Sequence, residues 1–164
     1  MIKSILIAFV ASATASVLFN ISRRNILWSA CTGTIGWSVY QLIITQGKPA
    51  VLATFAASLI IGLIGESFAI LRKKPATIFI LPGIIPLVPG AGMYFTMVAL
   101  QAQDVSAAAS TGIQTAFTAL AIACGLVISL SLLRLVRRQQ QKNSPGAGGN
   151  GKDLTEIPEH PADW

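Results

Sequence analysis

The amino-acid sequence predicts an all-α integral membrane protein, a bundle of about five transmembrane helices with the fourth broken by proline and glycine. Hydrophobic residues make up 53% of the 164-residue chain and charged residues only 11%, and the mean hydropathy is +0.67. Apolar stretches longer than about 18 residues, the length that a membrane-spanning helix needs, recur along the chain. Basic residues form short clusters at the ends of these stretches, a pattern that orients helices in membranes.

The composition also argues against several classes of function. The formal charge of +6 and the pI near 9.8 suggest nucleic-acid binding, but no soluble segment is long enough to form a basic folded surface. Cys31 and Cys124 lie inside apolar runs, without another Cys or a His at metal-ligand spacing. We therefore interpret both cysteines as packing residues and expect no metal and no cofactor.

The first predicted span covers residues 2–19 and carries small residues at helical spacing, which let another helix approach closely. These residues are Ala8, Ala11, Ser12, Ala15 and Ser16. A signal peptide is the alternative, because Lys3 precedes an apolar run and an Ala-Ser-Ala-Thr-Ala stretch. The apolar run continues to Phe19, and Arg23 and Arg24 follow it, which favours a retained helix.

The second and third predicted spans cover residues 26–44 and 51–71, with a short turn around Lys48 between them. Gly62 and Gly65 are three residues apart, which predicts a surface of close helix approach on one face of the third span. Glu66, beside them, is the one acidic residue within any predicted span.

The fourth predicted span, residues 77–100, has a centre that a continuous helix is not expected to cross. Its helix-breaking residues are Pro82, Gly83, Pro86, Pro89, Gly90 and Gly92. Each proline lacks an N–H, so the carbonyls of Ile78, Pro82 and Ile85 lose their usual helical partners. Such backbone is stable at membrane depth only inside protein or beside a wet cavity, where transporters use it to hold substrates and ions.

The fifth predicted span covers residues 109–133, with Thr111, Gln114, Thr115 and Thr118 in its first half. Residues 1–138 thus form the predicted transmembrane domain. Residues 139–164 are polar, rich in Gly and Pro and without periodicity, which predicts a disordered cytoplasmic tail.

With five spans, the basic clusters at residues 23–24, 72–74 and 134–142 all fall on one side of the membrane. Lys3, Lys48 and Asp104 fall on the other side. Placing the basic side in the cytoplasm predicts an outside N-terminus and a cytoplasmic C-terminus.

The broken span predicts a binding site. The half-helix after the break begins near Gly90 and would offer free N–H groups and a positive partial charge to a carboxylate. Carbonyls freed before the break would suit an ammonium group. The predicted substrate-binding residues are Pro86, Pro89, Gly90, Gly92, Tyr94, Thr96 and Thr115. An amino acid held by both ends and a dicarboxylate held by one end both fit this arrangement.

Glu66 is the candidate for proton coupling, because a carboxylate within a span is costly and often functional. The alternative is an interfacial carboxylate that reaches the membrane surface beside the cations at residues 72–74. No second carboxylate and no histidine lies in any predicted span, and no nucleophile elbow or phosphate-binding loop occurs. We therefore expect the protein not to be an enzyme.

The chain resembles the threonine/serine exporter family. The resemblance rests on GxxGE near the end of the third span, the basic residues and proline that follow, and FILPGIIPLVPGAGMY. It covers most of residues 26–133, and its most specific part is Pro86 to Gly90 with Tyr94. The chain is most similar to the small subunit of the split form of this exporter.

The resemblance implies an exporter of the bacterial inner membrane with ten spans, divided between this chain and a larger partner subunit. It implies threonine and serine as substrates and, for the split form, succinate. Our hypothesis is a subunit of a secondary exporter of small carboxylates, an antiporter driven by the proton gradient. The alternatives are a structural or assembly subunit, which scaffolds a partner that contains the whole pathway, and a small channel.

Overall fold

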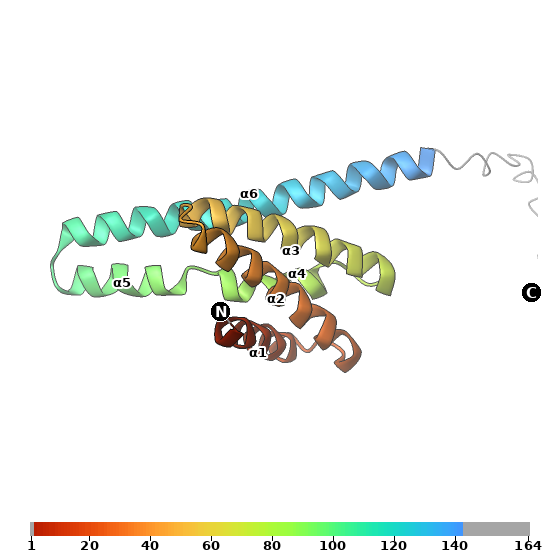
Figure 1. The fold of residues 1–164 in the computed structure, drawn as a ribbon, viewed down its shortest axis with the longest axis horizontal. Coiled ribbons are helices and arrows are strands. Elements are labelled where there is room, and N and C mark those ends of the chain that lie inside the picture. Colours follow the sequence, from red (N-terminus) through yellow and green to blue (C-terminus); the bar gives the residue numbers. More distant parts are fainter. Residues whose placement is uncertain (1, 143–164) are drawn as a thin grey trace, which may run out of the picture.

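A computed structural model describes residues 2–142 of the chain, and every regular element among them is helical. The first four helices are α1 (Ile2–Leu18), α2 (Arg23–Thr45), α3 (Ala50–Arg72) and α4 (Thr77–Ile84). A 3₁₀ turn, η1 (Ile85–Leu87), then leads to α5 (Gly90–Gln101) and α6 (Val105–Lys142). Figure 1 shows α5 and the start of α6 projecting from one end of the bundle that α1 to α4 form.

Two of the described helices are long and apolar enough to cross a membrane on their own: Ala50–Arg72 and, within α6, Val105–Leu133. The pair Thr77–Leu87 and Gly90–Gln101, bent by 46°, gives a third candidate span if it is counted as one. The apolar helix α1 is shorter. The structure thus supports a helical membrane protein, and the five-span count stays a prediction.

Helix α6 is longer than the predicted fifth span at both ends. The carboxylate of Asp104 accepts a hydrogen bond from the Ala107 N–H (3.0 Å), so it caps the helix N-terminus four residues before the predicted start. The helix continues to Lys142, past residue 139, where the polar tail was predicted to begin. Residues 143–164, the rest of that tail, lie outside the described residues.

Helices α3 and α6 run parallel in close contact. A Cβ added to Gly62 would lie 2.7 Å from the Ser129 Cβ, and one added to Gly125 would lie 2.8 Å from the Phe55 carbonyl oxygen. These glycines therefore let the two backbones approach, as small residues do between membrane helices. Gly65 points elsewhere: an added Cβ would meet Ile80 of α4. The predicted close-approach surface is confirmed at both glycines, but it faces two different helices, because three residues along a helix leave the two positions about 60° apart.

Helices α5 and α6 form an antiparallel hairpin. Gly92 packs against Thr115 and, one turn further from the break, Thr96 packs against Gly112. No residue of α5 is buried. The hairpin is therefore held by α6 and exposes its apolar side chains on the other faces.

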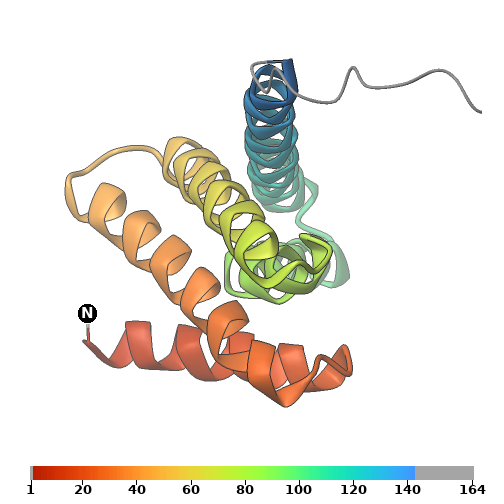
Figure 2. The same ribbon diagram turned by 90° about the vertical axis from the view of Figure 1, so that its right-hand side faces the viewer.

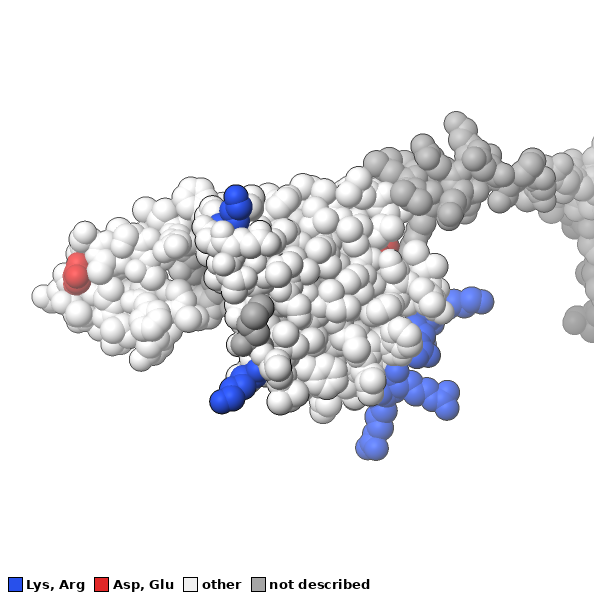
Figure 3. Space-filling view, in the orientation of Figure 1, with Lys and Arg blue, Asp and Glu red and all other residues white. Residues whose placement is uncertain are grey.

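Helix α1 crosses α2 at a steep angle, as Figure 2 shows. The small face of α1 predicted from the sequence is confirmed, since Ala8, Ser12, Ala15 and Ser16 are its buried residues. Figure 3 shows Lys and Arg side chains gathered at the end of the bundle away from the α5–α6 turn, with others near the middle of the molecule. An acidic side chain lies at the α5–α6 turn.

Candidate functional site

The predicted break is present, but Pro82 does not cause it. Pro82 lies inside α4, and the carbonyl of Ile78, which loses its helical partner, instead accepts a hydrogen bond from the Ser29 hydroxyl (3.4 Å). Ser29 in turn accepts one from Ser16 (2.9 Å). Helix α2 therefore supplies the donor that Pro82 cannot, and α4 continues for another half turn.

The chain leaves helical geometry between Ile85 and Pro89. The Val88 N–H donates to the Ile85 carbonyl (3.3 Å) in the place of the N–H that Pro89 lacks. Pro89 itself (φ −77°, ψ 54°) forms an inverse γ-turn, closed by the Gly90 N–H on the Val88 carbonyl (2.7 Å). The carbonyls of Ile78 and Ile85 thus each accept one hydrogen bond within the chain, and their predicted role for a substrate ammonium group stays a prediction.

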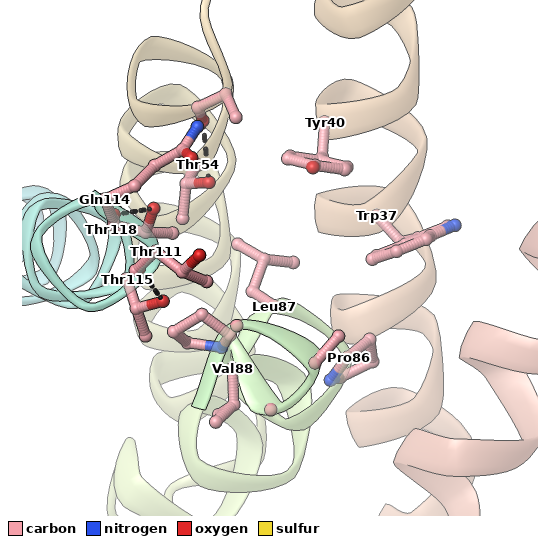
Figure 4. A pocket seen from close by; sticks show the side chains of 15 residues that line it. Trp37, Tyr40, Thr54, Pro86, Leu87, Val88, Thr111, Gln114, Thr115 and Thr118 are labelled. Atoms are coloured by element: carbon pink, nitrogen blue, oxygen red, sulfur yellow. Dashed lines mark hydrogen bonds between the residues drawn. The ribbon is translucent and has the colours of Figure 1, made fainter. Parts of the chain in front are cut away.

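A cavity of about 300 Å³ lies at this break, between α2, α3 and the base of the α5–α6 hairpin. Figure 4 shows it from close by, with hydroxyl groups of α3 and α6 on one side and the aromatic rings of α2 on the other. Its lining consists of Trp37, Tyr40, Ala50, Thr54, Pro86, Leu87, Val88, Pro89, Gly90, Ala91, Gly92, Thr111, Gln114, Thr115 and Thr118. The cavity is about twice the size of a protein cavity that holds benzene, so it has room for a small metabolite.

The start of α5 gives this cavity its hydrogen-bond donors. The N-cap is Pro89, which makes no side-chain capping bond, and the first turn contains no acidic residue. The Met93 N–H donates to the Pro89 carbonyl (3.2 Å), so the N–H groups of Ala91 and Gly92 have no acceptor within the helix. Together with the helix dipole, these groups favour an anion such as a carboxylate.

The hydroxyl-bearing side of the cavity, which packs against Gly92 of α5 at Thr115, gives the cavity acceptors. Thr54 donates its hydroxyl hydrogen to the Ala50 carbonyl (2.8 Å). In the same way Thr115 donates to the Thr111 carbonyl (2.7 Å), and Thr118 donates to the Gln114 carbonyl (2.9 Å). A hydroxyl that has used its hydrogen within its own helix still has oxygen lone pairs to accept with. These three threonines therefore present acceptors that suit an ammonium group.

The cavity, as far as described residues line it, contains no charged side chain. Within residues 2–142, no group of three His, Cys, Asp or Glu side chains is placed to hold a metal ion. The chemistry that this lining supports is the binding of a neutral or zwitterionic molecule by hydrogen bonds and the dipole of α5.

The structure brings five of the predicted site residues to the cavity and leaves three outside its lining. Pro86, Pro89, Gly90, Gly92 and Thr115 line it. Tyr94 lies on the hairpin, 65% exposed, with its ring beside Phe95. Thr96 packs against Gly112 and donates its hydroxyl hydrogen to the Gly92 carbonyl (2.8 Å).

Glu66 is far from the cavity. It lies on α3, 12 residues beyond Thr54, which corresponds to about 18 Å along the helix. Its side chain is only 7% exposed, so it is a buried carboxylate rather than one that extends into solvent. A direct contact between Glu66 and a molecule in the cavity is excluded by this separation.

Sequence reasoning did not assign Trp37, Tyr40, Thr54 and three polar residues of α6 to the site. The α6 residues carried a signal: Thr111, Gln114, Thr115 and Thr118 recur at intervals of three and four, which places them on one helix face. The residues of α2 and α3 carried none, because their place depends on how the helices pack.

A helical fold with an uncharged cavity at a helix break is the arrangement by which membrane transporters hold small substrates. Over residues 4–132 the chain matches the family described as Threonine/Serine exporter, ThrE, and it belongs to that family. No solved structure matches it. The resemblance noted in the sequence is thereby confirmed, and the family indicates a transporter rather than an enzyme.

Proposed function

We propose that this chain is a subunit of a secondary exporter of small carboxylate metabolites in the bacterial inner membrane. In this proposal it acts as an antiporter driven by the proton gradient and works together with a larger subunit of the same family. The observation that carries the proposal is the cavity at the α4–α5 break, lined by the start of α5 with its helix N–H donors and by hydroxyl acceptors of α3 and α6.

These donors and acceptors fit the two ends of an α-amino acid. The carboxylate would accept from the Ala91 and Gly92 N–H groups, and the ammonium group would donate to the hydroxyls of Thr54 and Thr115. The net charge of such a zwitterion is zero, which agrees with an uncharged lining. Succinate would place its second carboxylate among acceptors, so threonine and serine are the better fit and succinate is the second candidate.

The α5–α6 hairpin supports the proposal of a partner. The parallel contacts of α3 with α6 place Ala50 level with about residue 117, so residues 105–117 extend about 18 Å beyond the start of α3. On this hairpin, Tyr94, Phe95 and Met97 are 65%, 58% and 64% exposed. Apolar side chains over such a length fit coverage by a second membrane subunit.

Proton coupling is proposed to reside in Glu66, a buried carboxylate in a helix that reaches the cavity at its other end. Since Glu66 lies about 18 Å from Thr54, protonation would act through a movement of α3 and not through contact with the substrate. Glu66→Gln should uncouple export: efflux down a substrate gradient persists, but a protonophore no longer changes its rate. Equal protonophore sensitivity in Glu66→Gln and the unaltered protein would contradict this role.

The direct test is efflux from cells that are preloaded with labelled threonine or succinate and express this chain with or without a large subunit of the family. Efflux that requires both chains is the expected result, with threonine exported faster than succinate. Absence of efflux of both labels from cells with a purifiable complex would favour a scaffolding subunit.

One substitution separates transport from scaffolding. A side chain added at Gly90 meets no atom within 4 Å, so Gly90→Leu should block the cavity while the complex still assembles. Ala119→Leu, on an exposed face of α6 outside the cavity lining, is the matched control. Loss of efflux only in Gly90→Leu supports a substrate pathway at the break, and full efflux in both variants argues for a scaffold.

A further inference from the structure

A second cavity lies directly beside the first. Its volume is about 240 Å³, and it is lined by Ser4, Ile7, Ala8 and Ala11 of α1 together with Trp37 and Pro86. Trp37 and Pro86 also line the first cavity. These two residues are therefore the wall between the cavities. The volume of the second cavity exceeds that of a protein cavity that admits benzene, so it holds a molecule of the same size class as the first.

The side chain in this wall is not fixed by a hydrogen bond. The Trp37 Nε1 atom is buried and has no partner among the described residues. Figure 4 shows the ring of Trp37 opposite the hydroxyl-bearing wall, with its nitrogen directed away from the threonines. A buried N–H without an acceptor is unfavourable, and no hydrogen bond opposes rotation of the indole out of its present orientation.

The backbone that carries Trp37 is, by contrast, held firmly. Gly36 packs so closely on α3 that an added Cβ would lie within contact of the Ile61 side chain. The ring of Trp37 packs on Tyr40 at a centroid distance of 5.1 Å, a contact that side-chain rotation breaks without moving the helix. Movement at this wall is thus a movement of the indole and not of α2.

We propose that the cavity between α1 and Trp37 is a second compartment for the transported molecule, and that the Trp37 indole is the gate between the two compartments. The first compartment binds the charged ends of the substrate. The second, mostly apolar with the Ser4 hydroxyl at its edge, takes a small aliphatic molecule that carries a hydrogen-bond acceptor. This inference rests on the proposed function, because it assumes that a substrate occupies the first cavity.

The connection between the compartments is testable without a transport assay. In a background with Cys31→Ala and Cys124→Ala, Ala11→Cys reports on the second cavity and Thr111→Cys on the first. Because Ile7 on the rim of the second cavity is 68% exposed, the protein is reconstituted in a lipid bilayer, whose acyl chains cover this side. A small water-soluble thiosulfonate is then expected to label Thr111→Cys readily and Ala11→Cys slowly. Trp37→Ala should raise the labelling rate of Ala11→Cys at least tenfold and change that of Thr111→Cys less than twofold.

Trp37→Phe keeps a ring in the wall and should give an intermediate rate, so it replaces Trp37→Ala if the latter does not fold. The gate proposal is contradicted if neither substitution changes the labelling rate of Ala11→Cys. It is also contradicted if Ala11→Cys is labelled as fast as Thr111→Cys while Trp37 is in place. A second arm uses protection by threonine. Failure of threonine to protect Thr111→Cys argues against the proposed substrate site, whereas the effect of Trp37→Ala on Ala11→Cys tests the gate alone.

Discussion

Two glycines at the start of α5, two residues apart, should respond oppositely to the same substitution. An alanine Cβ at Gly90 meets no atom within 4 Å. At Gly92 it would clash with the Thr115 Oγ1 and lie 3.3 Å from both the Cβ and the Cγ2 of that residue. Rotation of Thr115 would move its Oγ1, but it would leave the Cβ at 3.3 Å and break the hydrogen bond to the Thr111 carbonyl. Gly90→Ala is therefore tolerated in the fold, and Gly92→Ala separates α5 from α6.

The difference in unfolding free energy between Gly90→Ala and Gly92→Ala reports the energy of the α5–α6 packing contact. Gly→Ala stabilises a helix by up to about 1 kcal/mol at either position, so this gain cancels in the comparison. Overpacking of a close contact costs about 1–3 kcal/mol. Since 1 kcal/mol shifts the Tm of a protein of this size by about 2–4 °C, Gly92→Ala should unfold about 2–12 °C below Gly90→Ala.

The measurement is thermal unfolding of the purified variants in detergent, followed by circular dichroism. A third protein, Gly92→Ala with Thr115→Ala, removes the two outer atoms of the clash and should recover at least half of the lost stability. Equal Tm values for Gly90→Ala and Gly92→Ala, or no recovery in the double variant, would refute the reasoning about the α5–α6 contact.

Three further predictions follow from other contacts. Ser29→Ala removes the donor to the Ile78 carbonyl and should lower the free energy of unfolding by about 1–3 kcal/mol. The control is Ser38→Ala, which loses a hydrogen bond only to its own helix and should change the free energy of unfolding by less than about 0.5 kcal/mol. Gly62→Ala should lower the Tm through its clash with Ser129, and the variant that also carries Ser129→Gly should recover part of the loss; an unchanged Tm in the single variant contradicts the α3–α6 contact. Thr115→Val keeps the side-chain shape but removes an acceptor from the cavity, and should raise the KM for threonine efflux about tenfold; an unchanged KM would exclude this hydroxyl from the substrate site.

The break in the fourth span was predictable because its cause is local. Proline lacks a donor wherever the chain folds, so the run of prolines from Pro82 to Pro89 had to interrupt the helical hydrogen bonds somewhere. The exact place was not predictable. Pro82 stays in a helix since Ser29, which is 49 residues before Ile78, donates to the Ile78 carbonyl that Pro82 leaves open. A contact between distant residues thus decides which proline ends the helix.

Some residues of the candidate site could likewise be predicted from the sequence, and others could not. Pro86, Pro89, Gly90 and Gly92 reach the cavity because they belong to the break itself. Tyr94 and Thr96 follow in sequence, but α5 carries them along the hairpin and out of the lining. The aromatic wall on α2 could not be predicted, since helix periodicity shows which face of a helix is small or polar but not which helix covers it.

The fold explains why a strained stretch of backbone is kept at this position. A 46° bend with two prolines leaves fewer helical hydrogen bonds than a straight span of the same length, and within apolar surroundings each unpaired backbone group is costly. Here the carbonyls of Ile78 and Ile85 each accept a hydrogen bond from a protein donor, whereas the N–H groups of Ala91 and Gly92, two residues that line the cavity, have no acceptor within α5. Two of the three carbonyls that the prolines leave open are thus paired, while the first turn of α5 keeps N–H groups without a helical acceptor, an asymmetry that favours an anionic group over a cation at this end of the helix.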